Sequence, residues 1–105
     1  MKILFIQLPV QDPSWESSRA NVPLAAGYLA AYAERQGLLK RGEWSLLSRE
    51  VSDYGSDTAV AEAIAREEPD LACFSLYLWN LDRSVHIAAR VAALCPRTRL
   101  VAGGP

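Results

Sequence analysis

The sequence predicts an α/β fold in which a parallel sheet lies between two layers of helices. Apolar runs typical of buried strands alternate along the chain with segments whose apolar residues follow helical spacing. Glycine, proline and asparagine lie between many of these segments, as expected of turns. Because such alternation produces right-handed crossovers, we expect a three-layer sandwich with four parallel strands in the order 2-1-3-4.

The first predicted strand spans Ile3–Leu8, where the apolar run is interrupted only by Gln7 and is bounded by Pro9. A run of this kind is typical of a strand buried on both faces, as in a parallel sheet. A polar stretch follows at 11–21, and its Asp12-Pro13-Ser14 segment predicts a turn.

The first predicted helix begins at Pro23 and ends at Gly37, a residue type that is common just beyond a helix. Asn21 is its expected N-terminal cap. The face predicted to pack inward carries Leu24, Tyr28, Leu29 and Tyr32.

The second half of the chain repeats the alternation of strand and helix. We expect a strand at Trp44–Val51, a loop at Asp53–Asp57, a helix at Thr58–Glu67 stopped by Pro69, and a strand at Asp70–Leu78. A third helix, capped by Asn80 or Asp82 and closed by Pro96, has a predicted inner stripe of Val85, Ala88, Val91, Ala92 and Cys95. With a fourth strand at Arg99–Ala102, the arrangement is flavodoxin-like, or Rossmann-like.

Length and composition restrict the functions that the chain can have. Its 105 residues fit one domain, and 50% of them are hydrophobic, enough to form a core. The 11 Lys and Arg nearly balance the 12 Asp and Glu, so no charge excess indicates nucleic acid or an anionic membrane. No targeting or membrane-spanning run is visible, and two separated cysteines predict free thiols, so we expect a cytoplasmic protein.

No catalytic group can be assembled from the reactive side chains. His86, the only histidine, shares the polar side of its predicted helix with Arg83 and Arg90. Cys73 and Cys95 fall at positions predicted to be buried, where thiols are usually inert. We therefore expect the chain itself to be non-catalytic and to hold no metal.

Ligands of open parallel sheets bind beyond the carboxyl ends of the strands. At those ends the sequence places Pro9, Asp53-Tyr54-Gly55, the segment Ser75–Asn80, and Gly103-Gly104. Ser75, Tyr77 and Trp79 offer a hydrogen-bonding group beside flat apolar surfaces, which suits a large planar ligand. The alternative is that the aromatic rings only cover the sheet edge and that Asn80 only caps a helix.

The two glycines favour a ligand whose contact with backbone is close, although turns after strands also use glycine. Neither G-x-G-x-x-G nor G-x-x-x-x-G-K-[ST] is present, so a nucleotide-phosphate loop is not expected.

Four segments together resemble the amino-terminal cobalamin-binding-type domain of radical SAM enzymes. They are the helix opening at 22–30 (VPLAAGYLA), Pro69-Asp70-Leu71, the segment 74–80 (FSLYLWN), and the ending 101–105 (VAGGP). The resemblance covers nearly the whole chain. Its most specific parts are Tyr-x-Trp-Asn and Gly-Gly-Pro at this separation, because the other segments are shared by many flavodoxin-like sheets.

The resemblance implies a domain that holds cobalamin against a catalytic module, in a methyltransferase or a related enzyme. The residues implied to bind or surround the cofactor are Pro9, Ser75, Tyr77, Trp79, Asn80, Gly103 and Gly104. Ser75 and Tyr77 would contact the nucleotide tail or the ring edge, and the glycines would leave room for the tail. The segment 7–12 (QLPVQD) lacks the histidine that ligates cobalt in the wider fold.

The iron–sulfur cluster and S-adenosylmethionine of such enzymes belong to a barrel that follows the domain. The cluster-binding loop C-x-x-x-C-x-x-C is absent from this sequence. Because the fourth predicted strand runs directly into Gly103-Gly104-Pro105, we expect the chain to be the amino-terminal piece of a longer protein. Apolar surface beside that strand should then be exposed, or covered by a second copy.

Two other functions are compatible with the same fold. One is a packing module that binds no ligand and only supports the barrel. The other is a signalling receiver, which needs an acidic pair after the first strand and an aspartate at the end of the third. This chain has Leu8-Pro9 and Ser75-Leu76 at those places, which disfavours the receiver.

Overall fold

A computed structural model describes residues 1–10 and 21–105 of the chain. Its strands are β1 (Ile3–Ile6), β2 (Trp44–Leu46), β3 (Leu71–Ser75) and β4 (Arg99–Gly103). Its helices in these ranges are α2 (Leu24–Arg35), α3 (Arg49–Tyr54), α4 (Asp57–Glu67) and α5 (Leu81–Leu94). The turn predicted at Asp12-Pro13-Ser14 lies outside the described residues.

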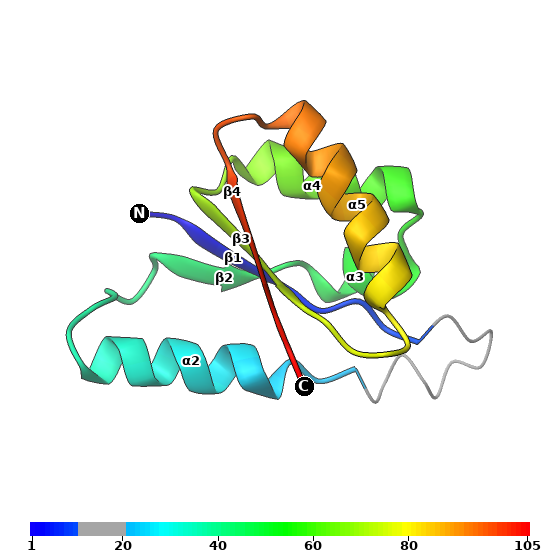
Figure 1. Cartoon of the computed structure of the whole chain (residues 1–105). Helices are drawn as coiled ribbons and strands as arrows, with labels where there is room; N and C mark the ends of the chain where they lie inside the picture. The colour runs from blue at the N-terminus through cyan, green and yellow to red at the C-terminus, as the bar shows by residue number, and fades with distance from the viewer. Residues whose placement is uncertain (11–20) are drawn as a thin grey trace.

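The four strands form one parallel sheet in the order β2-β1-β3-β4, which confirms the predicted topology. In its register, Ile3 pairs with both Trp44 and Leu71, and Cys73 pairs with Val101. Helix α2 covers one face of the sheet, and α3, α4 and α5 cover the other (Figure 1). The fold is therefore a three-layer α/β sandwich of the flavodoxin-like kind.

The hydrophobic core lies between the sheet and helices α4 and α5. Side chains of a strand alternate between the two faces, and alternate residues of β1 and β3 point into this core. They meet α4 and α5 side chains that are completely buried, and the main members are Leu4, Ile6, Ala72, Phe74, Val60, Ile64, Ile87 and Val91. These contacts supply most of the apolar burial of the domain.

Helix α2 packs on the sheet with a different face from the one predicted. Its buried residues are Ala26 and Ala30, whereas the four larger residues expected to face inward, Leu24, Tyr28, Leu29 and Tyr32, are all exposed. The alanine side allows the helix to lie close to the sheet, and the larger side chains then point outward. A hydrogen bond of 2.6 Å links α2 to β2: the indole Nε1 of Trp44 donates to the carboxylate of Glu34.

The predicted strand at Trp44–Val51 is wrong beyond its first half. Strand β2 ends at Leu46, and the Leu47 amide donates to the Phe5 carbonyl at the end of the ladder. The chain then turns into α3, where the Ser52 amide donates to the Ser48 carbonyl in the helical manner. The loop predicted at Asp53–Asp57 shrinks accordingly to the two residues between α3 and α4.

The last two helices follow the prediction more closely. Ser56 caps α4 by accepting a hydrogen bond of 3.1 Å from the Ala59 amide. In α5 the buried line is Ser84, Ile87 and Val91, so the predicted inner stripe is wrong at its exposed members, Val85 and Ala92. The reason is that Val85 lies over the outer side of β4, where no further helix of the described chain covers it.

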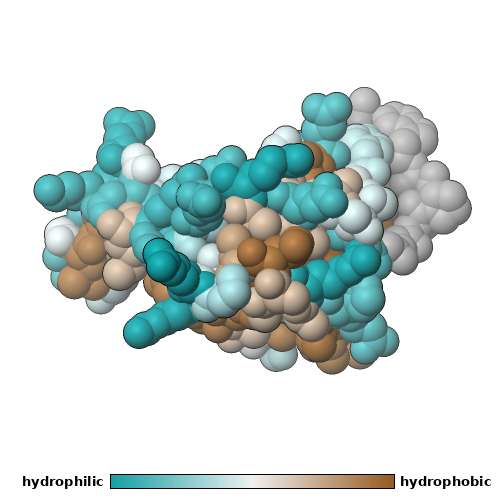
Figure 2. Space-filling model, turned by 90° about the horizontal axis from the view of Figure 1, so that it is seen from above, coloured by the Kyte–Doolittle hydropathy of each residue, from teal (hydrophilic) through white to brown (hydrophobic). Residues whose placement is uncertain are grey.

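The surface seen from above, on the α4 and α5 side of the molecule, is mixed. Figure 2 shows hydrophobic residues in the middle of the face and along its lower margin, with hydrophilic residues around them. The exposed apolar residues of β4 and the adjacent flank of α5 are Val85, Leu94, Leu100 and Val101. The expectation of exposed apolar surface beside the fourth strand is thus met.

Candidate functional site

The carboxyl ends of β3 and β4 bring together four of the residues predicted to bind a cofactor. Ser75 ends β3 and pairs directly with Gly103 of β4. The Leu76 amide extends this pairing by donating to the Gly103 carbonyl at 2.7 Å. Tyr77 and Gly104 follow on the two chains, so the four residues form one continuous rim at the end of the sheet.

Two hollows adjoin this rim and share Tyr77, Gly103 and Gly104. The inner hollow, of about 200 Å³, lies between α2 and the sheet and is also lined by Ala25, Leu29, Cys73 and Ser75. The outer hollow, of about 450 Å³, lies beside the start of α5 and is also lined by Leu76, Leu78, Leu81 and Pro105. None of the described residues that line either hollow carries a charge.

The polar groups of the inner hollow are few. Within 1–10 and 21–105, the Ser75 hydroxyl makes no hydrogen bond, although the Ser75 carbonyl accepts one. Cys73 lies deeper on the same strand, and burial raises the pKa of its thiol. A ligand in this hollow would therefore meet an available hydroxyl and a neutral thiol among apolar walls.

The two glycines of the rim have different structural roles. A Cβ on Gly104 would overlap the carbonyl oxygen of Leu76, so only glycine fits where these two segments cross. A Cβ on Gly103 would meet no atom within 4 Å, so the chain's own packing does not require glycine there. Gly103 lines both hollows, so the open space beside it is at the rim.

Tyr77 and Trp79 form a stacked pair beside the hollows. Their ring centroids are 4.7 Å apart and their planes differ by 3°. Trp79 remains 54% exposed, and Leu78 between them is almost completely exposed. The sequence predicted flat apolar surfaces in this segment, and the two rings cover one another face to face. Tyr77 lines both hollows, whereas Trp79 lines neither.

Asn80 is not available to a ligand, and it does not cap α5 through its side chain. Its side chain is buried, and its Nδ2 donates to the Leu8 carbonyl at 2.9 Å and to the Ser75 carbonyl at 3.1 Å. Its Oδ1 accepts from the Tyr77 amide at 2.8 Å. Asn80 thus ties the end of β1 to the end of β3 and holds the loop that carries Tyr77.

Pro9 contributes less directly than the sequence predicted. It is buried, and it lines neither the inner nor the outer hollow. Its neighbour Leu8 is completely buried and supplies the carbonyl that Asn80 binds. Leu8 therefore acts on the rim only indirectly, through Asn80, and Pro9 is the buried residue that follows it.

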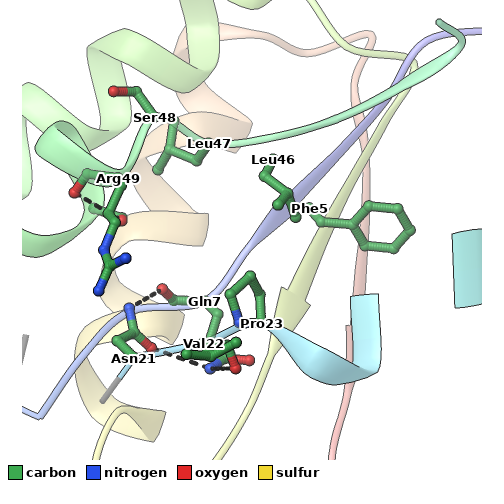
Figure 3. A pocket seen from close by; sticks show the side chains of 10 residues that line it. Phe5, Gln7, Asn21, Val22, Pro23, Leu46, Leu47, Ser48 and Arg49 are labelled. Carbon is green, nitrogen blue, oxygen red and sulfur yellow. Dashed lines mark hydrogen bonds between the residues drawn. The ribbon is translucent and has the colours of Figure 1, made fainter. Parts of the chain in front are cut away.

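A third hollow, which the sequence did not reveal, lies at the ends of β1 and β2 (Figure 3). Its volume is about 340 Å³, and polar side chains from Gln7, Asn21, Arg49 and Ser52 line it together with apolar ones. Asn21 is not the helix cap that was predicted: its amide donates to the Gln7 carbonyl and to Asp53, each at 3.0 Å. The contacts of Asn21 with Gln7 and Asp53 join residues far apart in the sequence, so no local sequence pattern predicts them.

Asp53 is the centre of this polar group. Its side chain is only 2% exposed and accepts hydrogen bonds from Asn21, Ser52 and Arg49. We interpret this third hollow as a buried structural network, because its polar groups are occupied mainly with one another.

The remaining reactive groups form no site in the described ranges. His86 is exposed, and its Nε2 is 3.9 Å from Asp57, which also accepts a hydrogen bond from Arg83 at 2.7 Å. Cys73 and Cys95 are free thiols. Among residues 1–10 and 21–105 there is no group of three His, Cys, Asp or Glu that could hold a metal ion.

Comparisons with models of protein families, with curated proteins and with solved structures find no match to this chain. The resemblance noted in the sequence therefore remains a hypothesis, and the fold and the geometry of the site are the basis for a proposal. As to membranes, the described helices include none that is long and apolar enough to cross one.

Proposed function

We propose that this chain is a cobalamin-binding-type domain of a radical SAM enzyme, and that it holds the cofactor at the rim formed by β3 and β4. The observation that carries the proposal is the meeting of Ser75, Tyr77, Gly103 and Gly104 around two adjoining hollows. These are four of the residues for which the resemblance implied contact with the cofactor. The larger hollow falls within the range of about 300–1,000 Å³ that is usual for ligand sites.

The chemistry of the rim suits a large ligand with a planar body. The ring of Tyr77, stacked on Trp79, offers apolar area at the rim, and the Ser75 hydroxyl offers one hydrogen bond. The space beside Gly103, in which a Cβ meets nothing, leaves room for a bulky group to approach the backbone. Asn80 acts as a positioning residue, because it fixes the loop that presents Tyr77.

This chain would bind the cofactor without a histidine on the cobalt. The only histidine, His86, lies on α5 beside Asp57 and lines neither hollow. When bound, cobalamin supplies a cobalt ion that can carry a methyl group. The part of this chain is to bind and orient the corrinoid and to limit its exposure to water.

The rest of the proposed enzyme lies outside this sequence. We propose that a radical SAM barrel in the same polypeptide holds the iron–sulfur cluster and S-adenosylmethionine and packs against the rim. We also propose a cytoplasmic location, because both cysteines are free thiols, as is usual in reducing compartments. No charge excess on the chain indicates a nucleic acid or a membrane as a further partner.

The direct test is a titration of the chain with hydroxocobalamin, followed by visible absorbance before and after desalting. Gly103→Val is the informative variant, because Gly103 lines both hollows and a Cβ there meets no atom of the chain, so the added side chain would take up space at the rim. Gly27→Ala is the matched control, since a Cβ there also meets nothing and Gly27 lines neither hollow. We expect Gly103→Val to weaken binding at least about tenfold, or roughly 1.4 kcal/mol.

Two results would contradict the proposal. If the wild-type chain retains no cobalamin, and a longer polypeptide with an intact cluster also retains none under anaerobic conditions, the domain is a packing module without a ligand. If the wild-type chain and Gly103→Val bind equally, the cofactor lies elsewhere than at the rim.

A further inference from the structure

The polar network of the third hollow fixes the direction of each side-chain amide in it. Asn21 Nδ2 donates to two oxygens, the Gln7 carbonyl and the Asp53 carboxylate, each at 3.0 Å (Figure 3). Asn21 Oδ1 therefore faces the side chain of Gln7 and accepts from Gln7 Nε2 at 3.0 Å. Gln7 Nε2 also donates to the Val22 carbonyl at 3.3 Å. A reversed Gln7 amide would bring oxygen against both acceptors, so Oε1 must be the atom left over.

Gln7 Oε1 is a buried acceptor without a donor. Within residues 1–10 and 21–105 it has no hydrogen-bond partner, although it is shielded from solvent. Buried polar atoms of native proteins nearly always have a partner, and burial of one without a partner is costly. Such an atom points to a donor that the chain itself does not supply, either an ordered water or a bound molecule.

The hollow that Gln7 lines is large enough for a small molecule. Its volume of about 340 Å³ falls within the range of about 300–1,000 Å³ that is usual for ligand sites. A buried water needs several polar partners, whereas half of the described lining is apolar. The apolar members are Phe5, Val22, Pro23, Leu46 and Leu47. These walls favour a molecule with an apolar body over water alone.

The charges at the hollow favour an uncharged ligand. Among the described residues that line it, only Arg49 is charged, and its Nε lies 3.2 Å from Asp53 Oδ2. The two charges balance each other. A carboxylate placed at Gln7 Oε1 would bring oxygen against oxygen, whereas an N–H group is the complement of that atom.

We propose that the third hollow binds a small uncharged molecule with an amide or aromatic-amine N–H on an apolar body, and that this N–H donates to Gln7 Oε1. The apolar body lies against Phe5 and Leu46, which are paired in the register of β1 and β2. Asn21 and Asp53 are positioning residues, because they fix the direction of the Gln7 amide. The network thus supports both the fold and a binding site.

This site is separate from the rim at the ends of β3 and β4. Among the described residues, the third hollow and the inner hollow have only Phe5 in common. The third hollow shares none with the outer hollow. The inference therefore goes beyond the proposed function and does not depend on the binding of cobalamin.

Two probes that differ in one group test the donor in the wild-type chain. Benzamide carries an amide N–H on a phenyl ring, and acetophenone has nearly the same shape with a methyl group in place of the amino group. In ¹H–¹⁵N NMR spectra, benzamide should shift the side-chain amide signals of Gln7 and the backbone amide signals of Leu46 and Leu47. Acetophenone should bind at least about tenfold more weakly, because it leaves Gln7 Oε1 without a donor.

A matched pair of variants locates the site. Gln7→Met removes Oε1 and keeps a side chain of similar length. Gln36→Met makes the same change at an exposed residue that lines none of the three hollows. With the Leu46 and Leu47 signals as the readout, we expect Gln7→Met to lower the affinity for benzamide about tenfold and to remove the preference over acetophenone. Gln36→Met should leave both unchanged.

Three results would overturn the proposal. If benzamide leaves the signals of Gln7, Leu46 and Leu47 unchanged, water alone satisfies Gln7 Oε1. If benzamide and acetophenone bind the wild-type chain equally, the ligand donates no hydrogen bond to that atom, and this comparison holds even where Gln7→Met does not fold. If the folded Gln7→Met chain binds benzamide as the wild type does, the molecule lies elsewhere.

Discussion

The two faces of the sheet differ in the size of the helix side chains that pack on them. On the α4 and α5 face, large aliphatic side chains of helix and strand interlock, and Ile64, Ile87 and Val91 are completely out of water. On the α2 face, the helix contributes mainly Ala26 and Ala30, and its larger side chains point outward. The first face supplies stability, whereas the second leaves the inner hollow between α2 and the sheet.

The largest difference between the faces should appear in truncations of buried and exposed aliphatic residues. Ile87→Ala removes a completely buried side chain and should cost about 2–5 kcal/mol of unfolding free energy. Leu29→Ala on α2, where the side chain is exposed, should cost less than about 1 kcal/mol. Urea unfolding followed by circular dichroism measures both. Equal losses would mean that α2 stabilises the fold as strongly as α5 does.

A smaller loss of unfolding free energy is expected at Asn80, which connects the chain after β1 to the end of β3. Asn80→Leu keeps the volume but leaves the Leu8 and Ser75 carbonyls and the Tyr77 amide without this partner. We expect a cost of about 1–3 kcal/mol, because unsatisfied buried polar groups are expensive. Asn80→Asp is the comparison: it still accepts from Tyr77 but cannot donate, so a loss no smaller than that of Asn80→Leu would show that donation to the carbonyls dominates.

The two glycines of the rim allow a sharper test. Gly104→Ala should destabilise the chain by more than about 1 kcal/mol, because its Cβ overlaps the Leu76 carbonyl oxygen. Gly103→Ala should leave the thermal unfolding midpoint nearly unchanged, because its Cβ meets no atom. If both substitutions are tolerated, the crossing of Leu76 and Gly104 is looser than the structure describes.

The smallest expected effect is the pH dependence of Cys73 on the α2 face. Burial raises the pKa of its thiol, so the folded chain holds the proton at a pH where the unfolded chain has lost it. Stability should therefore be highest below the ordinary thiol pKa of about 8.5 and should fall as the pH rises from there through the raised value. Denaturant unfolding of wild type and Cys73→Ala at several pH values measures this, and parallel curves would contradict it.

The fold could be predicted from the sequence because its signals are local and repeated. Alternating strands and helices, with right-handed crossovers, leave few possible arrangements, and the strand order followed. The inward face of α2 could not be predicted from the sequence, because the helix carries both an alanine stripe and a stripe of larger residues. The space available against the sheet decides between them, and spacing along the helix does not contain that information.

The site was predictable in part for the same reason. Ser75, Tyr77, Gly103 and Gly104 are near the ends of strands, and parallel strands end together, so their meeting followed from topology. The role of Asn80 did not follow, because an asparagine before a helix looks like a cap, and its actual partner Leu8 is 72 positions away in the sequence. The network around Asp53 was missed likewise, since its bond to Asn21 spans 32 positions.

The hydrogen bond between Trp44 and Glu34 makes the docking of α2 visible by fluorescence. Trp44 also lies edge-on to Phe5, with ring centroids 6.3 Å apart, so its indole is held between the helix and the sheet. Replacement of Trp15 and Trp79 by phenylalanine would leave Trp44 as the only tryptophan emitter. Separation of α2 from β2 would expose that indole to water and shift its emission to longer wavelength, so opening of the α2 layer could be timed without an attached dye.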